Sequence, residues 1–203
     1  QQLVLTVKEL RNNSIFVSRA AQKIEPIISK NKIDFNNKFV LDIGSSTGGF
    51  TQLALMLGAQ KVFAVELGTN QMEKTLRLNP NIDLHEKTDI LNVGLSTKYP
   101  VVMGSPADII MMDLSFITIT KILPHAKSLL SKNGIIIALV KPQFEARREE
   151  LIDGIVKNEK IRRNILKDFE NWSKKNFKII DKYDSELKGT KGNRERVYLL
   201  KGL

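Results

Sequence analysis

The sequence has no cysteine and no long apolar run, and each absence excludes a class of protein. Without cysteine the chain forms no disulfide bond and no thiolate metal site, which is compatible with a cytoplasmic location. Its longest apolar stretches, such as IIIALV at residues 135–140, have the length of buried strands and fall well short of the roughly 18 residues that cross a bilayer. A secretory signal pattern, internal repeats and low-complexity segments are also absent. We therefore expect a cytoplasmic protein that does not insert into a membrane.

The composition fits one folded domain whose charge is unevenly distributed. A chain of 203 residues with 42% hydrophobic residues is long and apolar enough for a full core. The net charge is +10: residues 1–38 carry 7 basic and 3 acidic groups, residues 39–140 carry 8 of each, and residues 141–203 carry 17 and 11. The excess at the two ends indicates either an ordinary solvated surface or a face that binds a polyanion.

The apolar periodicity alternates between strands and helices from residue 38 onward. It predicts strands at 38–44, 61–67, 81–89, 107–115 and 134–142. Helices are predicted over 18–29, with Ser18 as the N-cap, over about 119–130, and over 158–175. The last two strands, 177–184 and 194–202, have no helix between them, which favours antiparallel pairing.

This alternation predicts an α/β fold: a doubly wound, mostly parallel sheet of seven strands with an antiparallel last strand and helices on both faces. Ligands of such sheets bind outside the carboxyl ends of the strands. The residues that directly follow the strands are therefore the candidates for a functional site.

A glycine-rich loop follows the first of these strands, in VLDIGSSTGGFTQLAL at residues 40–55. No lysine follows its glycines, so it is not a triphosphate-binding loop. Asp42 lies two residues before Gly44, where a carboxylate would repel the pyrophosphate of a dinucleotide. The same carboxylate would suit a cofactor with a cationic centre and an ammonium group, and S-adenosylmethionine is such a cofactor.

Acidic residues at the next strand ends extend this prediction. Glu66 could accept hydrogen bonds from both ribose hydroxyls of an adenosine, and Asp89 could accept one from the adenine amine. We predict that the following residues bind the cofactor: Asp42, Gly44, Ser45, Ser46, Thr47, Gly48, Gly49, Phe50, Glu66, Asp89 and Asp113.

The other half of the predicted sheet ends in an acid and a lysine. The fourth strand runs into DLSF and the fifth into KPQF, so Asp113 and Lys141 should project into one crevice. A carboxylate and an amine together can position a hydroxyl group and manage its proton. An ordinary structural ion pair would give the same spacing.

Five sequence blocks resemble one family. FVSRAAQKIE, VLDIGSSTGGFTQ, MMDLSFI, LVKPQFE and KGTKGNRERVYLL look like the hemolysin A (TlyA-type) branch of the FtsJ-like ribosomal RNA 2′-O-methyltransferases, in the family's order. The resemblance runs from about Phe16 to the C-terminus. It implies the Rossmann-like methyltransferase fold and transfer of a methyl group from S-adenosylmethionine to a ribose 2′-hydroxyl, with cytidine in ribosomal RNA as the expected target.

The resemblance also implies a catalytic tetrad and a division of the chain. Matching the blocks places the tetrad at Lys23, Asp113, Lys141 and Glu195, with Lys141 in the central role. Seen alone, Lys23 and Glu195 would pass for surface residues. Residues 1–15 would be a linker and the remnant of an N-terminal RNA-binding module, with its last strand around Leu3 to Val7, and residues 16–203 the methyltransferase domain.

The basic ends of the chain become candidates for contact with ribosomal RNA or ribosomal subunits. The charged stretch after KPQFE, ARREELIDGIVKNEK, is expected to form a flexible lid that becomes ordered when RNA binds. The predicted RNA-binding residues are Arg11, Arg19, Arg147, Arg148, Lys188, Lys191, Arg194 and Arg196, and Arg162 is a further candidate.

Three other functions compete with this interpretation. A hemolysin-like, membrane-active protein gains little support from a sequence without a spanning segment. A non-catalytic RNA-binding or ribosome-assembly factor would keep the fold but not turn over. An NAD-dependent dehydrogenase is disfavoured by the charge of Asp42.

Overall fold

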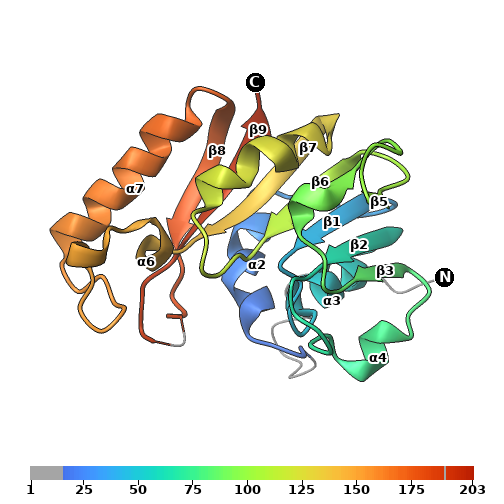
Figure 1. Ribbon diagram of the computed structural model, residues 1–203, viewed down its shortest axis with the longest axis horizontal. Helices are drawn as coiled ribbons and strands as arrows, with labels where there is room; N and C mark the ends of the chain where they lie inside the picture. Colours follow the sequence, from blue (N-terminus) through green and yellow to red (C-terminus); the bar gives the residue numbers. More distant parts are fainter. Residues whose placement is uncertain (1–15, 190) are drawn as a thin grey trace.

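The computed structural model describes residues 16–189 and 191–203. The predictions for Arg11 and for the strand around Leu3 to Val7 lie outside these residues. A seven-stranded sheet forms the centre of the molecule (Figure 1). In spatial order its strands are β3 (Ile82–His85), β2 (Lys61–Val65), β1 (Phe39–Ile43), β6 (Ala107–Met112), β7 (Leu130–Val140), β9 (Arg196–Gly202) and β8 (Phe177–Asp184).

The strand pairings confirm the predicted topology. β1 pairs in parallel with β2 and β6, β2 with β3, and β6 with β7. β9 runs antiparallel to both β7 and β8, as the missing helix between the last two strands predicted. A separate two-stranded sheet of β4 (Val93–Gly94) and β5 (Val101–Val102) was not predicted, because two-residue strands leave no periodicity to recognise.

Helices cover both faces of the sheet (Figure 1). α2 and α3 pack on one face, and α5 and α7 pack on the other. The helices are α2 (Ala20–Lys30), α3 (Gly49–Met56), α4 (Lys74–Arg77), α5 (Leu123–Ser128), α6 (Pro142–Glu145) and α7 (Glu159–Ser173), with short 3₁₀ helices η1 (Ile90–Asn92), η2 (Ile119–Lys121) and η3 (Arg148–Glu150).

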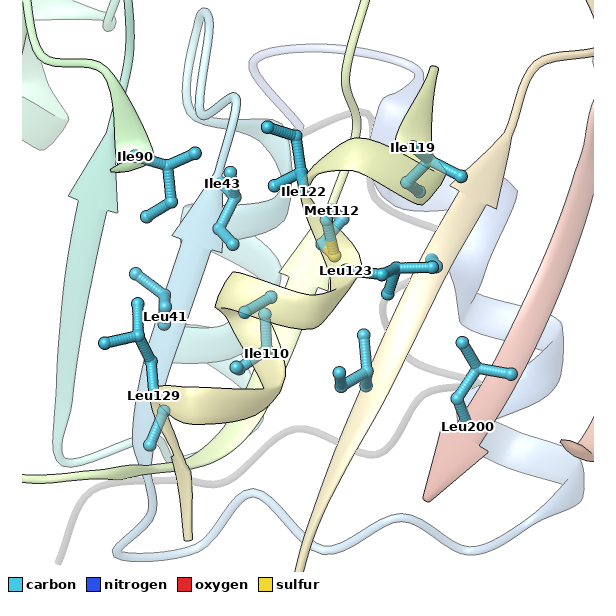
Figure 2. Packing of buried hydrophobic residues seen from close by; sticks show 14 of the residues in the cluster. Leu41, Ile43, Ile90, Ile110, Met112, Ile119, Ile122, Leu123, Leu129 and Leu200 are labelled. Atoms are coloured by element: carbon cyan, nitrogen blue, oxygen red, sulfur yellow. The ribbon is translucent and has the colours of Figure 1, made fainter. Parts of the chain in front are cut away.

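Two apolar cores lie on opposite faces of the sheet because successive strand side chains point in opposite directions. Leu41 of β1 belongs to the core under α5 and α7, and its neighbour Val40 belongs to the core under α2 and α3. Figure 2 shows side chains of β1, β6 and the α5 region meeting in the first of these cores. The predicted apolar stripe of α7 also faces this core, where Phe169 is buried.

Two local predictions are wrong. The helix predicted over 119–130 ends at Ser128, and Leu130 already belongs to β7, where it pairs with Ala107. The N-cap of α2 is Arg19, although the Ser18 hydroxyl still accepts a hydrogen bond from the backbone N–H of Ala20 at 3.3 Å. The pairing of Leu130 with Ala107 sets the first of these boundaries.

The charged stretch after α6, predicted to be a flexible lid, has a folded conformation in this structure. Ile152 and Ile155 form an antiparallel bridge, which closes a tight turn. The buried side chain of Asn193 clamps this turn: it accepts a hydrogen bond from the backbone N–H of Val156 at 3.0 Å and donates one to the carbonyl of Gly154 at 3.0 Å. The stretch is thereby attached to the loop that precedes β9.

Candidate active site

Two cavities open at the carboxyl ends of the parallel strands and share part of their walls. The larger, of about 420 Å³, is lined by Glu66 and Asp89, and the smaller, of about 250 Å³, by Lys23. Gly44, Ser46 and Asp113 line both cavities. The structure therefore brings the predicted glycine loop, strand-end acids and one predicted catalytic lysine to a single edge of the sheet.

The glycine loop approaches its neighbours too closely for side chains. Gly44 has a φ of +83°, and a Cβ there would lie 2.6 Å from the backbone oxygen of Asp113. A Cβ on Gly49 would lie 2.2 Å from the Ser18 hydroxyl oxygen and 3.3 Å from the Ala20 Cβ, so a larger residue there would displace the Ser18 side chain. Of the other predicted loop residues, Ser45, Thr47 and Phe50 line the smaller cavity, and Gly48 instead packs against Leu76 and Met72.

Asp42 lies beneath this loop and lines neither cavity. It is fully buried, and its Oδ2 accepts a hydrogen bond from the Thr51 hydroxyl at 2.6 Å. Burial raises the pKa of Asp42 to about 7, against the lowering effect of the Thr51 hydrogen bond. The argument that a full negative charge on Asp42 selects against a dinucleotide therefore loses its basis, because near neutral pH this carboxyl is only partly ionised.

The buried carboxyl predicts a pH-dependent effect of Asp42→Asn. An unfolded aspartate ionises near pH 4, whereas the folded one ionises near 7, so wild-type stability falls as the pH rises between these values. The amide lacks this ionisation. The unfolding free energy of Asp42→Asn minus that of wild type should therefore rise by on the order of 4 kcal/mol between pH 4 and pH 8. Denaturant titrations at several pH values measure it, and a difference that stays constant with pH contradicts the buried site.

Glu66 and Asp89 lie at the larger cavity, and both already bind backbone. Glu66 accepts hydrogen bonds from the N–H of Ser46 at 2.9 Å and of Gly68 at 2.7 Å, one on each oxygen. It thereby ties the glycine loop to the loop after β2. Asp89 caps η1 through its Oδ1, which accepts the N–H of Leu91 at 3.0 Å. Each carboxylate oxygen can accept a second hydrogen bond, so both side chains can still receive ligand donors.

Asp113 and Lys141 form the ion pair that the strand ends predicted. Lys141 Nζ lies 2.8 Å from Asp113 Oδ1 and donates a hydrogen bond to the hydroxyl of Ser115 at 2.8 Å. Their side chains are 11% and 19% exposed, so water reaches the pair only partly. Ser115 had no predicted role, although its place in DLSF directly after a strand is the signal that points to it.

Lys23 and Glu195 form a second ion pair at 2.6 Å, with side chains 13% and 2% exposed. Neither is a surface residue, so the expectation from the sequence alone is wrong. Both lie on apolar faces: Lys23 shares a helix face with Ala20 and Ile27, and Glu195 alternates with Val197 and Leu199. A charged residue within an apolar pattern was the available signal.

The β7–β9 register joins the two ion pairs into one site. Val140 pairs with Arg196, so the next residues outward, Lys141 and Glu195, leave the sheet at the same end of these strands. Lys23 reaches Glu195 from α2, and Lys23 and Asp113 line the same cavity. The four residues matched to the tetrad thus form two ion pairs beside the smaller cavity.

The predicted RNA-binding residues divide into two groups. Arg19 and Lys188 line the smaller cavity, and Arg147, Arg148, Lys191 and Arg194 are exposed. For Arg196 and Arg162 the predicted RNA contact does not fit the structure, because both pair with Asp184 within the protein. Arg196 Nε donates to Asp184 Oδ1 at 2.7 Å, and the buried Arg162 also pairs with Asp184. Burial acts to raise the pKa of Asp184, but these hydrogen bonds hold it below its usual range. Both guanidinium groups are committed inside the protein.

Phe116 is a site residue that had no predicted role. It is 92% exposed at the rim of the larger cavity, and its backbone has a φ of +67°. Its ring contacts that of Phe144, with centroids 5.2 Å apart. A large aromatic side chain held in water beside a ligand cavity is typical of a surface that stacks on a planar ligand.

Comparisons with known proteins identify the family of the chain. The FtsJ-like methyltransferase family matches residues 16–202. The 23S rRNA (cytidine-2′-O)-methyltransferase TlyA of Campylobacter jejuni is 36% identical over 189 residues, which are 92% of this chain and 71% of that protein. Hemolysin A of Brachyspira hyodysenteriae is 36% identical over 193 residues, which are 92% of this chain and 77% of that protein.

A solved structure shows that the similarity extends to the whole fold. The crystal structure of a candidate hemolysin from Lactococcus lactis superimposes with a TM-score of 0.86 at 33% sequence identity. The match covers 93% of this chain and 89% of that chain. The chain belongs to the FtsJ-like methyltransferase family, in its TlyA/hemolysin A branch.

Proposed function

We propose that this chain transfers the methyl group of S-adenosylmethionine to the 2′-hydroxyl of a cytidine in ribosomal RNA. The observation that carries the proposal is the pairing of Asp113 with Lys141 and of Lys23 with Glu195 beside a cavity that adjoins a nucleoside-sized one. The Campylobacter relative is named for this reaction. The family match and the intact tetrad residue types support the same chemistry here.

The larger cavity fits S-adenosylmethionine. A volume of about 420 Å³ is in the range of small-molecule sites. Glu66 and Asp89 offer acceptors for ribose hydroxyls and an adenine amine, and Leu67, Leu91 and Ile117 offer apolar surface. On the glycine loop, Ser45 Oγ, at the adjoining smaller cavity, is buried without a hydrogen-bond partner among the described residues. Such orphaned polar atoms are expected where a polar ligand or water completes the site.

Lys141 can both orient the ribose hydroxyl and remove its proton. An ammonium has three N–H donors. One donates to the Ser115 hydroxyl, Asp113 Oδ1 lies 2.8 Å from the Nζ as its counter-ion, and a remaining N–H can bind the 2′-oxygen. When bound, S-adenosylmethionine supplies an electrophilic methyl group. If an ammonium proton passes to Asp113, Lys141 becomes the amine that accepts the 2′-hydroxyl proton, and the pair then carries one more proton and one more positive charge than before. Lys23 and Glu195 would fix the polar wall beside it.

The exposed basic residues give the RNA a place to bind. Arg19 and Lys188 lie at the smaller cavity, and Arg147, Arg148 and Lys191 extend the positive surface across the clamped turn and the loop before β9. Such groups contact phosphates and position RNA without reading its sequence. Phe116 offers a ring on which a base can stack. With a ribosomal substrate, we also propose a cytoplasmic location.

The helices of the described residues do not support the membrane-active alternative. None of the helices there is both long enough and apolar enough to span a bilayer. The apolar stripe of α7 is used inside the protein, where Ile165, Leu166 and Phe169 are buried. Whether the chain turns over or only binds RNA is decided by experiment.

A methyl-transfer assay tests the proposal. The protein is incubated with S-adenosylmethionine labelled in its methyl group and with either free ribosomal RNA or isolated ribosomal subunits. Label in RNA that requires the protein is the expected result, and the two substrates distinguish recognition of naked RNA from recognition of an assembled subunit. RNA that binds with no transfer of label would establish the non-catalytic alternative.

Glu66→Gln should weaken cofactor binding without unfolding the protein. Glutamine can accept only one of the two backbone hydrogen bonds that Glu66 accepts, from Ser46 and Gly68 on loops that border the cavity. We expect a loss of affinity for S-adenosylmethionine of about tenfold or more, measured by titration calorimetry. NAD is the control ligand, and Glu73→Gln, at an exposed position outside the cavity, is the matched variant. Equal affinity in Glu66→Gln and wild type contradicts the assignment.

A further inference from the structure

Glu145 connects two segments that each carry part of the site. It is the last residue of α6, four positions after Lys141. Its Oε1 accepts a hydrogen bond from the backbone N–H of Ile119 at 2.7 Å, and its Oε2 accepts one from the Thr118 hydroxyl. The Thr118 hydroxyl in turn lies 2.8 Å from that of Thr120. A single carboxylate thus ties α6 to the loop that follows β6.

The same two segments are joined at two further points along their length. At one end Lys141 contacts both Asp113 and Ser115. In the middle the rings of Phe144 and Phe116 meet. Glu145 makes the contact at the other end. The segment 141–145 therefore holds the loop 113–119 at three successive places, and Glu145 provides the only carboxylate among these contacts that lies outside the matched tetrad.

The loop needs such support because its conformation is unfavourable. Phe116 has a φ of +67°, which a bulky residue adopts only where the surrounding structure enforces it. Its side chain is 92% exposed, so burial of the ring does not supply that enforcement. The hydrogen bonds at Ser115, Thr118 and Ile119 on either side of Phe116 do.

We propose that Glu145 is a positioning residue: by bracing the loop 113–119 against α6 it holds Lys141 and Phe116 in the arrangement that methyl transfer requires. The half-buried position fits a brace rather than an RNA contact, and desolvation raises the pKa of Glu145. Glu145 lines neither cavity, so it acts through its neighbours. The expected effect of Glu145 on methyl transfer rests on the proposed function. The brace itself is measured separately, by hydrogen exchange at the Ile119 amide.

The first arm of the test measures steady-state methyl transfer by the full chain. Glu145→Ala should lower kcat by about tenfold or more, because small displacements of reacting groups are costly. Glu145→Gln should recover kcat to within about threefold of wild type, because its amide can accept from Ile119 and donate to the Thr118 oxygen. Thr118→Val, which removes one hydroxyl, is a milder variant with an intermediate expected loss. Glu149→Ala, at an exposed neighbouring position, is the matched control.

The second arm needs no activity. The Ile119 amide hydrogen should exchange with solvent about tenfold faster in Glu145→Ala than in wild type or Glu145→Gln, while amides in the middle of α7 keep their rates. Unchanged exchange at Ile119 overturns the brace. If the wild type is active and Glu145→Ala has the same kcat, the positioning role alone is overturned. Equal losses of kcat in Glu145→Ala and Glu145→Gln overturn it as well. Absence of transfer by wild type overturns the proposed function and the catalytic role of Glu145 with it.

Discussion

Lys141→Met is expected to reduce methyl transfer by about a thousandfold or more, since general base and orienting functions are lost together. The methionine keeps the length and apolar stem of the lysine, so packing beside the Asp113 and Ser115 side chains is preserved, while the ion pair with Asp113 and the hydrogen bond to Ser115 are removed. The affinity for S-adenosylmethionine should stay within a few-fold of wild type, because Lys141 does not line the larger cavity. Single-turnover transfer and titration calorimetry measure the two effects separately.

Two further variants define what Lys141 contributes. Lys141→Arg keeps the positive charge but does not give up a proton at physiological pH, so we expect it to remain nearly inactive. Lys167→Met, an exposed lysine on α7, removes a charge of the same sign away from the site and should be active. Activity in Lys141→Arg would show that a positive charge at this position suffices and that Lys141 does not accept the hydroxyl proton.

Breaking the pair of Lys23 and Glu195 is expected to produce the second large effect, on stability as well as activity. Lys23→Met leaves Glu195, which is 2% exposed, without its cation, and loss of one partner of a buried pair costs about 3–5 kcal/mol. Glu195→Met should cost less, because Lys23 is 13% exposed and can reach water. The variant with both substitutions removes both charges and should regain most of the unfolding free energy.

Activity distinguishes a catalytic pair from a structural one. The double variant should be nearly as stable as wild type and still fail to transfer methyl groups, because Lys23 lines the smaller cavity together with Asp113. Denaturant unfolding and the labelled-methyl assay on the same preparations give both quantities. Turnover restored along with stability would show that the pair only holds α2 against β9.

The strand and helix order was predictable because the apolar pattern of a buried parallel sheet is strong. VLDI, VFAV and IIMM read directly as β1, β2 and β6, and the missing helix between the last two strands gave the antiparallel end. The end of α5 was not predictable from periodicity. Leu130 continues the apolar spacing of the helix, but its backbone pairs with Ala107, a contact between residues distant in sequence.

The site was predictable where it lies at strand ends and not where it depends on burial. Glu66, Asp89, Asp113 and Lys141 follow directly from the rule for parallel sheets. Lys23 and Glu195 come from α2 and from the residue before β9, and only the family resemblance singled them out. The behaviour of Asp42 could not be foreseen either, because its pKa depends on complete burial under the glycine loop.

The predicted RNA contacts show the same limit of sequence reasoning. A basic residue near a chain end is indistinguishable by type from one that serves inside the fold. Arg196 and Arg162 meet Asp184, so they stabilise the packing of α7 on β8 and β9. Arg147, Arg148 and Lys191 are exposed.

One measurement tests the central claim most directly: the identity of the nucleoside that carries the label after transfer. RNA methylated by the wild-type chain is digested to nucleosides and separated. The account predicts label in 2′-O-methylcytidine, and none when Lys141→Met replaces the wild type. Label on a base, or label on the ribose that persists in Lys141→Met, would contradict the assignment of the paired lysine and aspartate to a ribose hydroxyl.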